Sequence, residues 1–183
     1  MSRACALPRT VVLVGLMGAG KSSIGRRLAQ RFKVPFIDTD SEIETAAGAT
    51  IEEIFERHGE GAFREGERRV IARLLEGPVQ VLATGGGAFM DPATRALMRE
   101  RALTVWLRAD VDLLLPRVMR RNNRPLLKNA DPRAVLERLI TERYPLYAEA
   151  DLTVDTIEGP PEATMERVVA ALTPWLVAQP VAS

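Results

Sequence analysis

The chain has 183 residues, of which 25 are Lys or Arg and 24 are Asp or Glu. This balance excludes binding to nucleic acid or to a membrane surface through bulk charge, so any electropositive site must be local. The single cysteine, Cys5, and the single histidine, His58, exclude an internal disulfide framework and a Cys or His cluster for a metal ion.

The length and the hydrophobic content of 46% fit one globular domain with a substantial core. The N-terminal residues lack the apolar stretch of a signal peptide, and no window approaches 18 uninterrupted apolar residues. We therefore expect a cytoplasmic protein with no membrane span. We also expect a monomer. We expect one domain over residues 10–172, with a loose N-terminal segment 1–9 and a C-terminal tail 173–183.

Short apolar runs that alternate with helical patterns predict an α/β fold. The predicted strands are 10–14, 35–37, 79–83, 103–107 and 152–154. Their apolar residues are mostly continuous, which is typical of parallel strands buried on both faces. Helix starts are indicated by a capping box at 50–53 and by Asp-Pro pairs at 91–92 and 131–132. Repeated strand–helix–strand units predict a doubly wound parallel sheet.

The first predicted strand leads into Gly15-Leu-Met-Gly-Ala-Gly-Lys-Ser22, which is the pattern G-x-x-x-x-G-K-S. Its glycines allow a tight backbone curl whose N–H groups point at a phosphate. Lys21 can reach the β- and γ-phosphates, and the Ser22 hydroxyl can hold Mg²⁺. The helical spacing that follows places the loop at a helix N-terminus, which favours a bound anion. This motif predicts nucleotide binding.

Ligands of a parallel sheet lie at the carboxyl ends of its strands. After the second strand, Asp38 and Asp40 stand two residues apart, so one can help hold Mg²⁺ while the other orients a substrate hydroxyl or accepts its proton. Which of the two is the base stays open. Alternatively, Asp40 caps a helix that runs from Ser41.

Three glycines, Gly85 to Gly87, follow the third strand. A simple turn rarely needs three, so we expect the backbone to lie tightly against a ligand there. Arg64 and Glu67 are three residues apart and share a helix face, although an ordinary surface ion pair is the commoner fate of such a pair.

Arginines and prolines late in the chain suggest two further elements. Arg117, Arg120, Arg121 and Arg124 lie in and beside a segment of about 120–130 that resembles a mobile lid, the alternative being a basic surface loop. Pro145 interrupts a helical pattern and can aim Arg143 inward, where its guanidinium suits a carboxylate. The alternative is an exposed Arg143.

Six motifs in order resemble those of shikimate kinase. They are Gly15–Ser22, Phe36–Asp40, Phe63-Arg64-x-x-Glu67, Gly85–Gly87, Arg124–Leu127 and Arg143-x-Pro-Leu-Tyr147. The resemblance covers about residues 10–172. It implies a P-loop kinase fold with a lid and a five-stranded parallel sheet of order 2-3-1-4-5. It also implies transfer of the γ-phosphoryl group of ATP to the shikimate 3-hydroxyl with one Mg²⁺, in the route to chorismate and the aromatic amino acids.

The resemblance also assigns roles to residues. The implied catalytic residues are Lys21, Asp40 and Arg124, and the implied metal-side residues are Ser22 and Asp38. The implied ATP-binding residues are Gly18, Ala19, Gly20, Lys21, Ser22, Ser23, Arg117, Arg124 and Pro161. The implied substrate-binding residues are Asp40, Arg64, Gly85, Gly86, Gly87 and Arg143, with Glu67 supporting Arg64.

Three alternatives remain at this point. Gluconate kinase shares the P-loop and the sheet, but it is not expected to combine the glycine triplet with both substrate arginines. Nucleoside monophosphate kinases normally have a different loop or lid. A non-catalytic nucleotide-binding module would be expected to have lost Asp40, Arg64 or Arg143, and all three are present.

Overall fold

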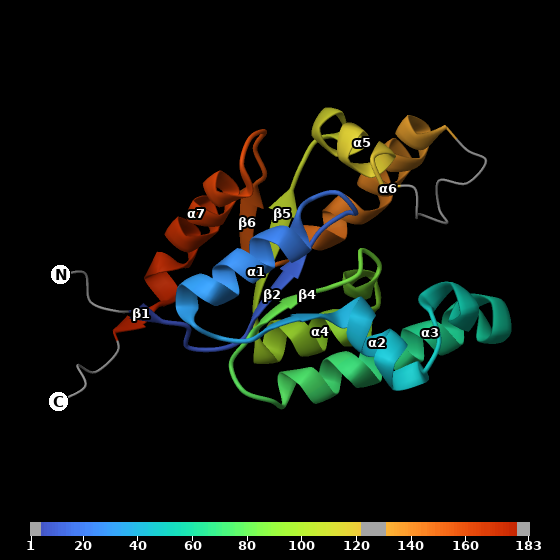
Figure 1. The fold of residues 1–183 in the computed structure, drawn as a ribbon, viewed down its shortest axis with the longest axis horizontal. Coiled ribbons are helices and arrows are strands. Elements are labelled where there is room, and N and C mark those ends of the chain that lie inside the picture. The colour runs from blue at the N-terminus through green and yellow to red at the C-terminus, as the bar shows by residue number, and fades with distance from the viewer. Residues whose placement is uncertain (1–4, 122–130, 179–183) are drawn as a thin grey trace.

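The fold is built on a five-stranded parallel sheet (Figure 1). The computed structural model describes residues 5–121 and 131–178. The strands are β2 Val11–Val14, β3 Phe36–Asp38, β4 Val81–Ala83, β5 Leu103–Arg108 and β6 Leu152–Asp155. The sheet order is β3-β4-β2-β5-β6, which is 2-3-1-4-5 when these five strands are counted along the chain. The predicted fold class and strand order are therefore confirmed, and the predicted strand ends differ by one or two residues.

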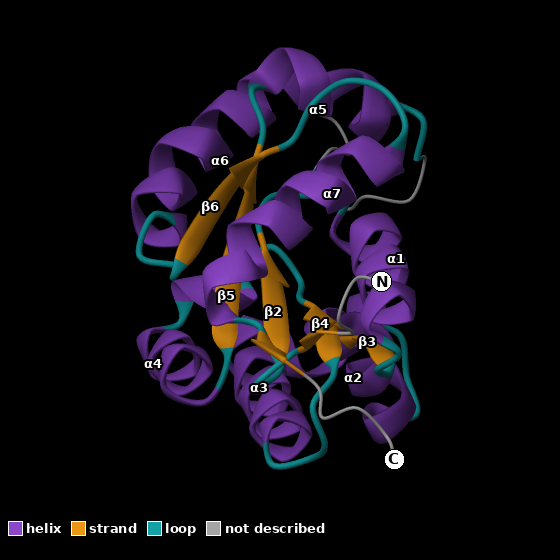
Figure 2. Cartoon of the chain, turned by 90° about the vertical axis from the view of Figure 1, so that its left-hand side faces the viewer, coloured by secondary structure: helices purple, strands orange, loops and turns teal. Residues whose placement is uncertain are grey.

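Helices cover both faces of this sheet (Figure 2). On one face α1 packs against β2, β3, β4 and α7, while α3, α4 and α6 lie on the other. The helices are α1 Lys21–Phe32, α2 Thr39–Ala47, α3 Ile51–Leu75, α4 Pro92–Arg101, α5 Val111–Met119, α6 Pro132–Tyr147 and α7 Pro161–Leu172. Two 3-10 turns, η1 Ala88–Met90 and η3 Thr173–Trp175, complete the set for the described residues. None of the described helices is long and apolar enough to cross a membrane.

The helix starts follow the predicted capping signals. Thr50 and Glu53 form the reciprocal capping box of α3. The side chains of Asp91 and Asp131 cap α4 and α6, each one residue before a proline. Inside α3, Gly59 has φ 79° and ψ 174°, so the helix is broken there and starts again toward Arg64.

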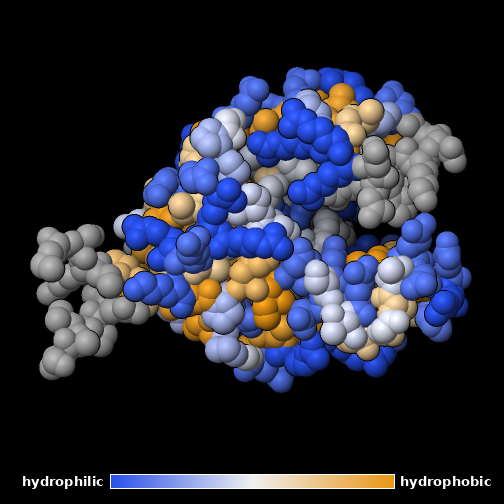
Figure 3. Space-filling model, viewed as in Figure 1, coloured by the Kyte–Doolittle hydropathy of each residue, from blue (hydrophilic) through white to orange (hydrophobic). Residues whose placement is uncertain are grey.

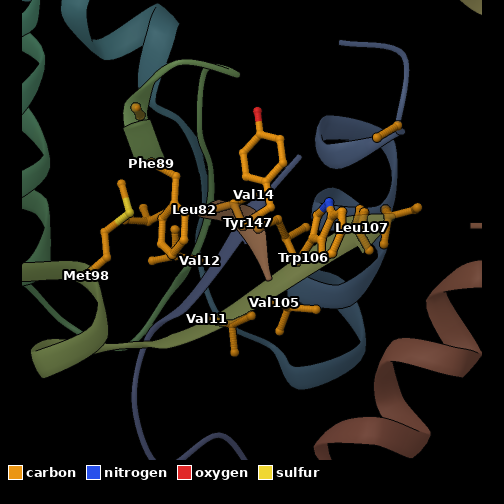
Figure 4. Close-up of a cluster of buried hydrophobic side chains, with 14 of the residues drawn as sticks. Val11, Val12, Val14, Leu82, Phe89, Met98, Val105, Trp106, Leu107 and Tyr147 are labelled. Atoms are coloured by element: carbon orange, nitrogen blue, oxygen red, sulfur yellow. The ribbon is translucent and has the colours of Figure 1, made fainter. Parts of the chain in front are cut away.

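The core lies against the central strands. All four residues of β2 are completely buried, because helices cover both faces of the sheet. Figure 4 shows Val12, Leu82, Phe89 and Met98 on one side of this cluster, with Trp106 and Tyr147 further along the sheet. Tyr147 is the largest of the fully buried side chains.

The two ends of the domain differ from the expectation of a loose segment and a tail. Strand β1, Cys5–Ala6, pairs in antiparallel fashion with β7, Val177–Ala178. Backbone pairing across the termini left no signal in a local sequence pattern, since each strand has only two residues and its partner lies at the opposite end of the chain.

Candidate active site

The P-loop joins β2 to α1. Gly15, Gly18 and Gly20 have φ values of 147°, 82° and 92°, which a side chain would make costly. The Lys21 ammonium donates hydrogen bonds to the carbonyl oxygens of Gly15 and Leu16, at 2.7 and 2.9 Å. The lysine is therefore folded over its own loop, where a phosphate chain would also lie.

Asp38 is the N-cap of α2, so the alternative in which Asp40 caps a helix from Ser41 is wrong. One carboxylate oxygen of Asp38 accepts from the backbone N–H groups of Asp40 and Ser41. Its other oxygen accepts from the Ser22 hydroxyl at 2.8 Å. The contact between Ser22 and Asp38 brings together two side-chain oxygens at the start of α1, and oxygen atoms are the ligands that Mg²⁺ prefers.

Asp40 lies in the first turn of α2 rather than on an extended strand end. Both aspartates nevertheless line one cavity of about 450 Å³ beside the P-loop. Figure 3 shows a hollow on this face of the molecule, with hydrophilic residues around much of it. The cavity lining includes Gly18, Gly20, Lys21, Ser22, Ser23, Asp38, Asp40, Gly85, Gly86, Arg117, Arg120, Arg121, Thr156, Ile157, Gly159 and Pro161. The predicted P-loop, metal-side and adenine-side residues are thus brought together.

Arg117 connects the P-loop to the loop after β6. Its guanidinium donates to the carbonyl oxygen of Gly18 at 3.2 Å and to that of Ile157 at 3.4 Å. Pro161 begins α7 at the far end of the same loop. Arg117 and Pro161 both line the cavity, and the adenine site predicted between them stays a prediction.

The three glycines after β4 each leave room for one predicted substrate residue. A Cβ added at Gly85 would lie 2.8 Å from the Asp40 carboxylate, and one added at Gly86 would lie 3.0 Å from Nη1 of Arg143. A Cβ added at Gly87 would lie 2.2 Å from Nη2 of Arg64. A side chain at any of these positions would push the charged group beside it, so the triplet is a surface on which three charged groups are gathered.

Arg64 and Glu67 do not form the exposed ion pair of the alternative interpretation. Nη1 of Arg64 donates to Oε1 of Glu67 at 2.7 Å, and the Glu67 side chain is only 1% exposed. Burial raises the pKa of Glu67, although the adjacent Arg64 opposes this effect. A buried carboxylate on one side of the Arg64 guanidinium fixes its orientation, and the rest of the guanidinium lies against Gly87.

Some predicted residues lie apart from the cavity lining or outside the described residues. Arg64, Gly87 and Arg143 are not part of the cavity lining, and they lie directly beyond Gly86. Arg124, with most of the predicted lid, falls in 122–130, outside the described residues.

Tyr147 contacts Gly86 and lies close to Arg143, and the sequence analysis assigned it no role. Its i, i+4 spacing from Arg143 was the available signal.

The site combines a P-loop at the carboxyl end of the central strand, two aspartates beside the loop and an adjoining pair of arginines. Together these features define a P-loop kinase of small molecules. Solved structures of similar fold include a gluconokinase from Sinorhizobium meliloti, at 20% identity and a TM-score of 0.62, with 92% of this chain and 94% of that one covered. At this identity the likeness shows the fold alone.

The comparisons then narrow the class. The family model described as shikimate kinase matches residues 17–173. The shikimate kinase of Paramagnetospirillum magneticum is 58% identical over 168 residues, which cover 92% of this chain and 86% of the relative. A structure of shikimate kinase from Acinetobacter baumannii in complex with shikimate has 40% identity and a TM-score of 0.86, covering 91% of this chain and 93% of that one. The chain belongs to the shikimate kinase family.

Proposed function

We propose that this protein transfers the γ-phosphoryl group of ATP to the 3-hydroxyl of shikimate, which gives shikimate 3-phosphate and ADP. The observation that carries the proposal is the placement of Asp40, Arg143 and Arg64 against Gly85, Gly86 and Gly87 in turn. A carboxylate that can handle a hydroxyl proton thus adjoins two cations that can hold an acid group. Shikimate carries both kinds of group.

The two arginines recognise the shikimate carboxylate. Guanidinium groups donate paired, planar hydrogen bonds that match the two oxygens of a carboxylate. Arg64 is held from behind by the buried Glu67, and Arg143 lies beside Gly86. The alternative acceptor, gluconate, also has a carboxylate, so the acceptor has to be tested directly.

Asp40 is the residue that orients the acceptor hydroxyl and takes its proton. The Asp38 oxygens serve the N-terminus of α2 and the Ser22 hydroxyl, which suits Asp38 to the metal side. As Asp40 accepts the proton, the hydroxyl oxygen forms its bond to the γ-phosphorus. The bond from that phosphorus to the β–γ bridging oxygen breaks, and ADP leaves with the electron pair.

The nucleotide lies along the P-loop with its adenine between Arg117 and Pro161. Lys21 exchanges its contacts to Gly15 and Leu16 for the phosphates, where its charge offsets the charge that develops in transfer. Ser22 and Asp38 are the residues that would hold Mg²⁺, which neutralises charge on the β- and γ-phosphate oxygens. In the described chain no group of three or more His, Cys, Asp or Glu side chains could hold a metal ion. The role of Arg124 on the phosphates stays a prediction.

The test is ADP release by the purified protein with ATP and excess Mg²⁺, measured with shikimate, with gluconate and with no acceptor. Turnover that requires shikimate supports the proposal. Turnover with gluconate but not with shikimate would show that the protein phosphorylates a different acceptor. Binding of ATP without turnover on any acceptor would favour a non-catalytic module.

The carboxylate contact has its own test. Replacing Arg143 by Lys keeps the charge but removes the paired geometry, so the KM for shikimate should rise by about tenfold or more while the KM for ATP changes by about twofold at most. An equal rise in the KM for shikimate and the KM for ATP would mean that Arg143 does not bind shikimate specifically.

A further inference from the structure

Tyr147 is a buried polar side chain at the edge of the site. It is the last residue of α6 and is completely buried. Its ring packs near Trp106 and Phe89, with centroid distances of 5.8 and 6.4 Å. Figure 4 shows its hydroxyl oxygen pointing away from the apolar side chains around the ring.

That hydroxyl meets two parts of the substrate site at once. It donates a hydrogen bond to the carbonyl oxygen of Gly86, the middle glycine of the triplet. The guanidinium of Arg143 reaches the same glycine: a Cβ added at Gly86 would lie 3.0 Å from Nη1 of Arg143 and 3.6 Å from the Tyr147 hydroxyl oxygen. Because Arg143 stands four residues earlier on α6, both side chains leave the same face of the helix, and both approach Gly86.

We propose that Tyr147 is a positioning residue for the acceptor: its hydroxyl joins the Gly86 carbonyl to the Arg143 guanidinium and so sets the direction in which Arg143 meets the substrate carboxylate. This inference rests on the proposed function of Arg143. The ring, wedged between Trp106 and Phe89, supplies the rigidity, and the hydroxyl supplies the direction.

The chemical state of the phenol suits this role. Burial raises the pKa of Tyr147 to about 12, although the charge of Arg143 opposes that shift. The hydroxyl therefore stays protonated at neutral pH and donates to Gly86, which leaves its oxygen lone pairs to face the cationic Arg143. Since Arg has five N–H donors, those not used by Tyr147 remain for a carboxylate.

The test is Tyr147→Phe, which keeps the ring and removes only the hydroxyl. The matched control is Tyr144→Phe. Tyr144 lies on the same helix and in the same aromatic cluster, but its hydroxyl donates to the carbonyl oxygen of Ala109. Both variants lose one hydrogen bond to a backbone carbonyl, so both should lose similar thermal stability.

The two variants should differ in acceptor binding. For Tyr147→Phe we expect the dissociation constant of shikimate, measured by calorimetry, and its KM to rise about tenfold, with the KM for ATP changed about twofold at most. For Tyr144→Phe we expect all these constants to stay within about twofold of the parent. If Tyr147→Phe lowers the melting temperature and leaves shikimate binding unchanged, Tyr147 is only structural and the inference is wrong.

A double-mutant cycle with Arg143→Lys separates this inference from the proposed function. If Tyr147 acts through Arg143, the effect of Tyr147→Phe on shikimate binding should largely disappear in the Arg143→Lys background. Full additivity would contradict the inference. If Arg143→Lys alone leaves shikimate binding unchanged, the proposed role of Arg143 fails, whatever Tyr147 does.

Discussion

Of the three glycines beside the proposed substrate site, Gly87 leaves the least space for a side chain. Its backbone, with φ −88° and ψ −10°, suits any amino acid. Glycine is needed there for space, because an added Cβ would lie 2.2 Å from Nη2 of Arg64. The atoms that would be displaced are the far end of a flexible side chain, so Arg64 can move aside with little effect on the core.

Gly87→Ala should therefore weaken acceptor binding more than it weakens the fold. We expect the KM for shikimate to rise about tenfold as Arg64 is pushed away from Glu67, with the KM for ATP nearly unchanged. The control is Gly61→Ala on α3, where an added Cβ meets nothing within 4 Å. Steady-state kinetics of both variants decide the matter, and a normal shikimate KM for Gly87→Ala would show that Arg64 does not contact the substrate.

Glu67 gives a prediction of pH dependence. Burial raises its pKa above the ordinary value of 4.5, so the folded protein holds this proton more tightly than the unfolded chain does. The resulting stabilisation is fully present below that value and is lost as the pH rises through the raised pKa. The Glu67→Gln variant lacks this titration.

The melting temperature of Glu67→Gln minus that of the parent should consequently become more positive as the pH rises from about 4 to about 8. At neutral pH the same variant should raise the KM for shikimate, because Arg64 loses the carboxylate that orients it. A melting-temperature difference that moves the opposite way would mean that Arg64 outweighs burial and lowers the pKa of Glu67.

Among the elements, α3 is unusual in containing a break. Gly59 lies in a backbone region that only glycine adopts readily, and no neighbouring atom restricts the space for a Cβ. Gly59→Ala should cost about 1–3 kcal/mol of unfolding free energy through backbone strain alone. In a chain of this length each kcal/mol lowers the melting temperature by about 2–4 °C.

Gly61→Ala is the matched control here too, since Gly61 lies two residues further on in regular helix. There alanine should leave stability unchanged or raise it by up to ~1 kcal/mol. Thermal unfolding of the two variants under the same conditions measures the difference. Equal melting temperatures would mean that α3 runs straight through Gly59 in solution.

The elements also show what the sequence could predict. The strands were found from continuous apolar runs, because a parallel strand buried on both faces needs no polar alternation. Capping chemistry located helix starts such as Thr50 because it is local. The short β1–β7 pair and the capping role of Asp38 depend on partners or on a helix boundary that a local pattern does not specify.

The sequence also predicted part of the site. The P-loop and the glycine triplet were evident from spacing, and the resemblance supplied roles for Arg64 and Arg143. The assignment of each glycine to one charged side chain was not predictable, because it depends on how β4, α2, α3 and α6 meet in space. The same holds for the Tyr147 hydroxyl, whose partner Gly86 is 61 residues away in the chain.

At the scale of the whole molecule, the site consists of two halves that different elements carry. The proposed nucleotide half joins the P-loop, Arg117 and the start of α7, while the proposed acceptor half joins α2, α3 and α6 around the glycine triplet. Arg117 and Gly87 belong to different halves and contact different residues. Removing one contact from each half should therefore have independent effects on ground-state binding.

A double-mutant cycle of Arg117→Ala and Gly87→Ala tests this independence. Arg117→Ala should raise the KM for ATP, since the P-loop and the loop after β6 lose their link, and it should leave the KM for shikimate within about twofold. The double variant should show the sum of the two changes in the free energies of ATP and shikimate binding, within about 0.5 kcal/mol. Calorimetry with a non-hydrolysable ATP analogue and with shikimate, each alone, measures these terms. A larger deviation would show that the glycine triplet transmits strain from one half of the site to the other, and the two halves would then have to be treated as a single unit.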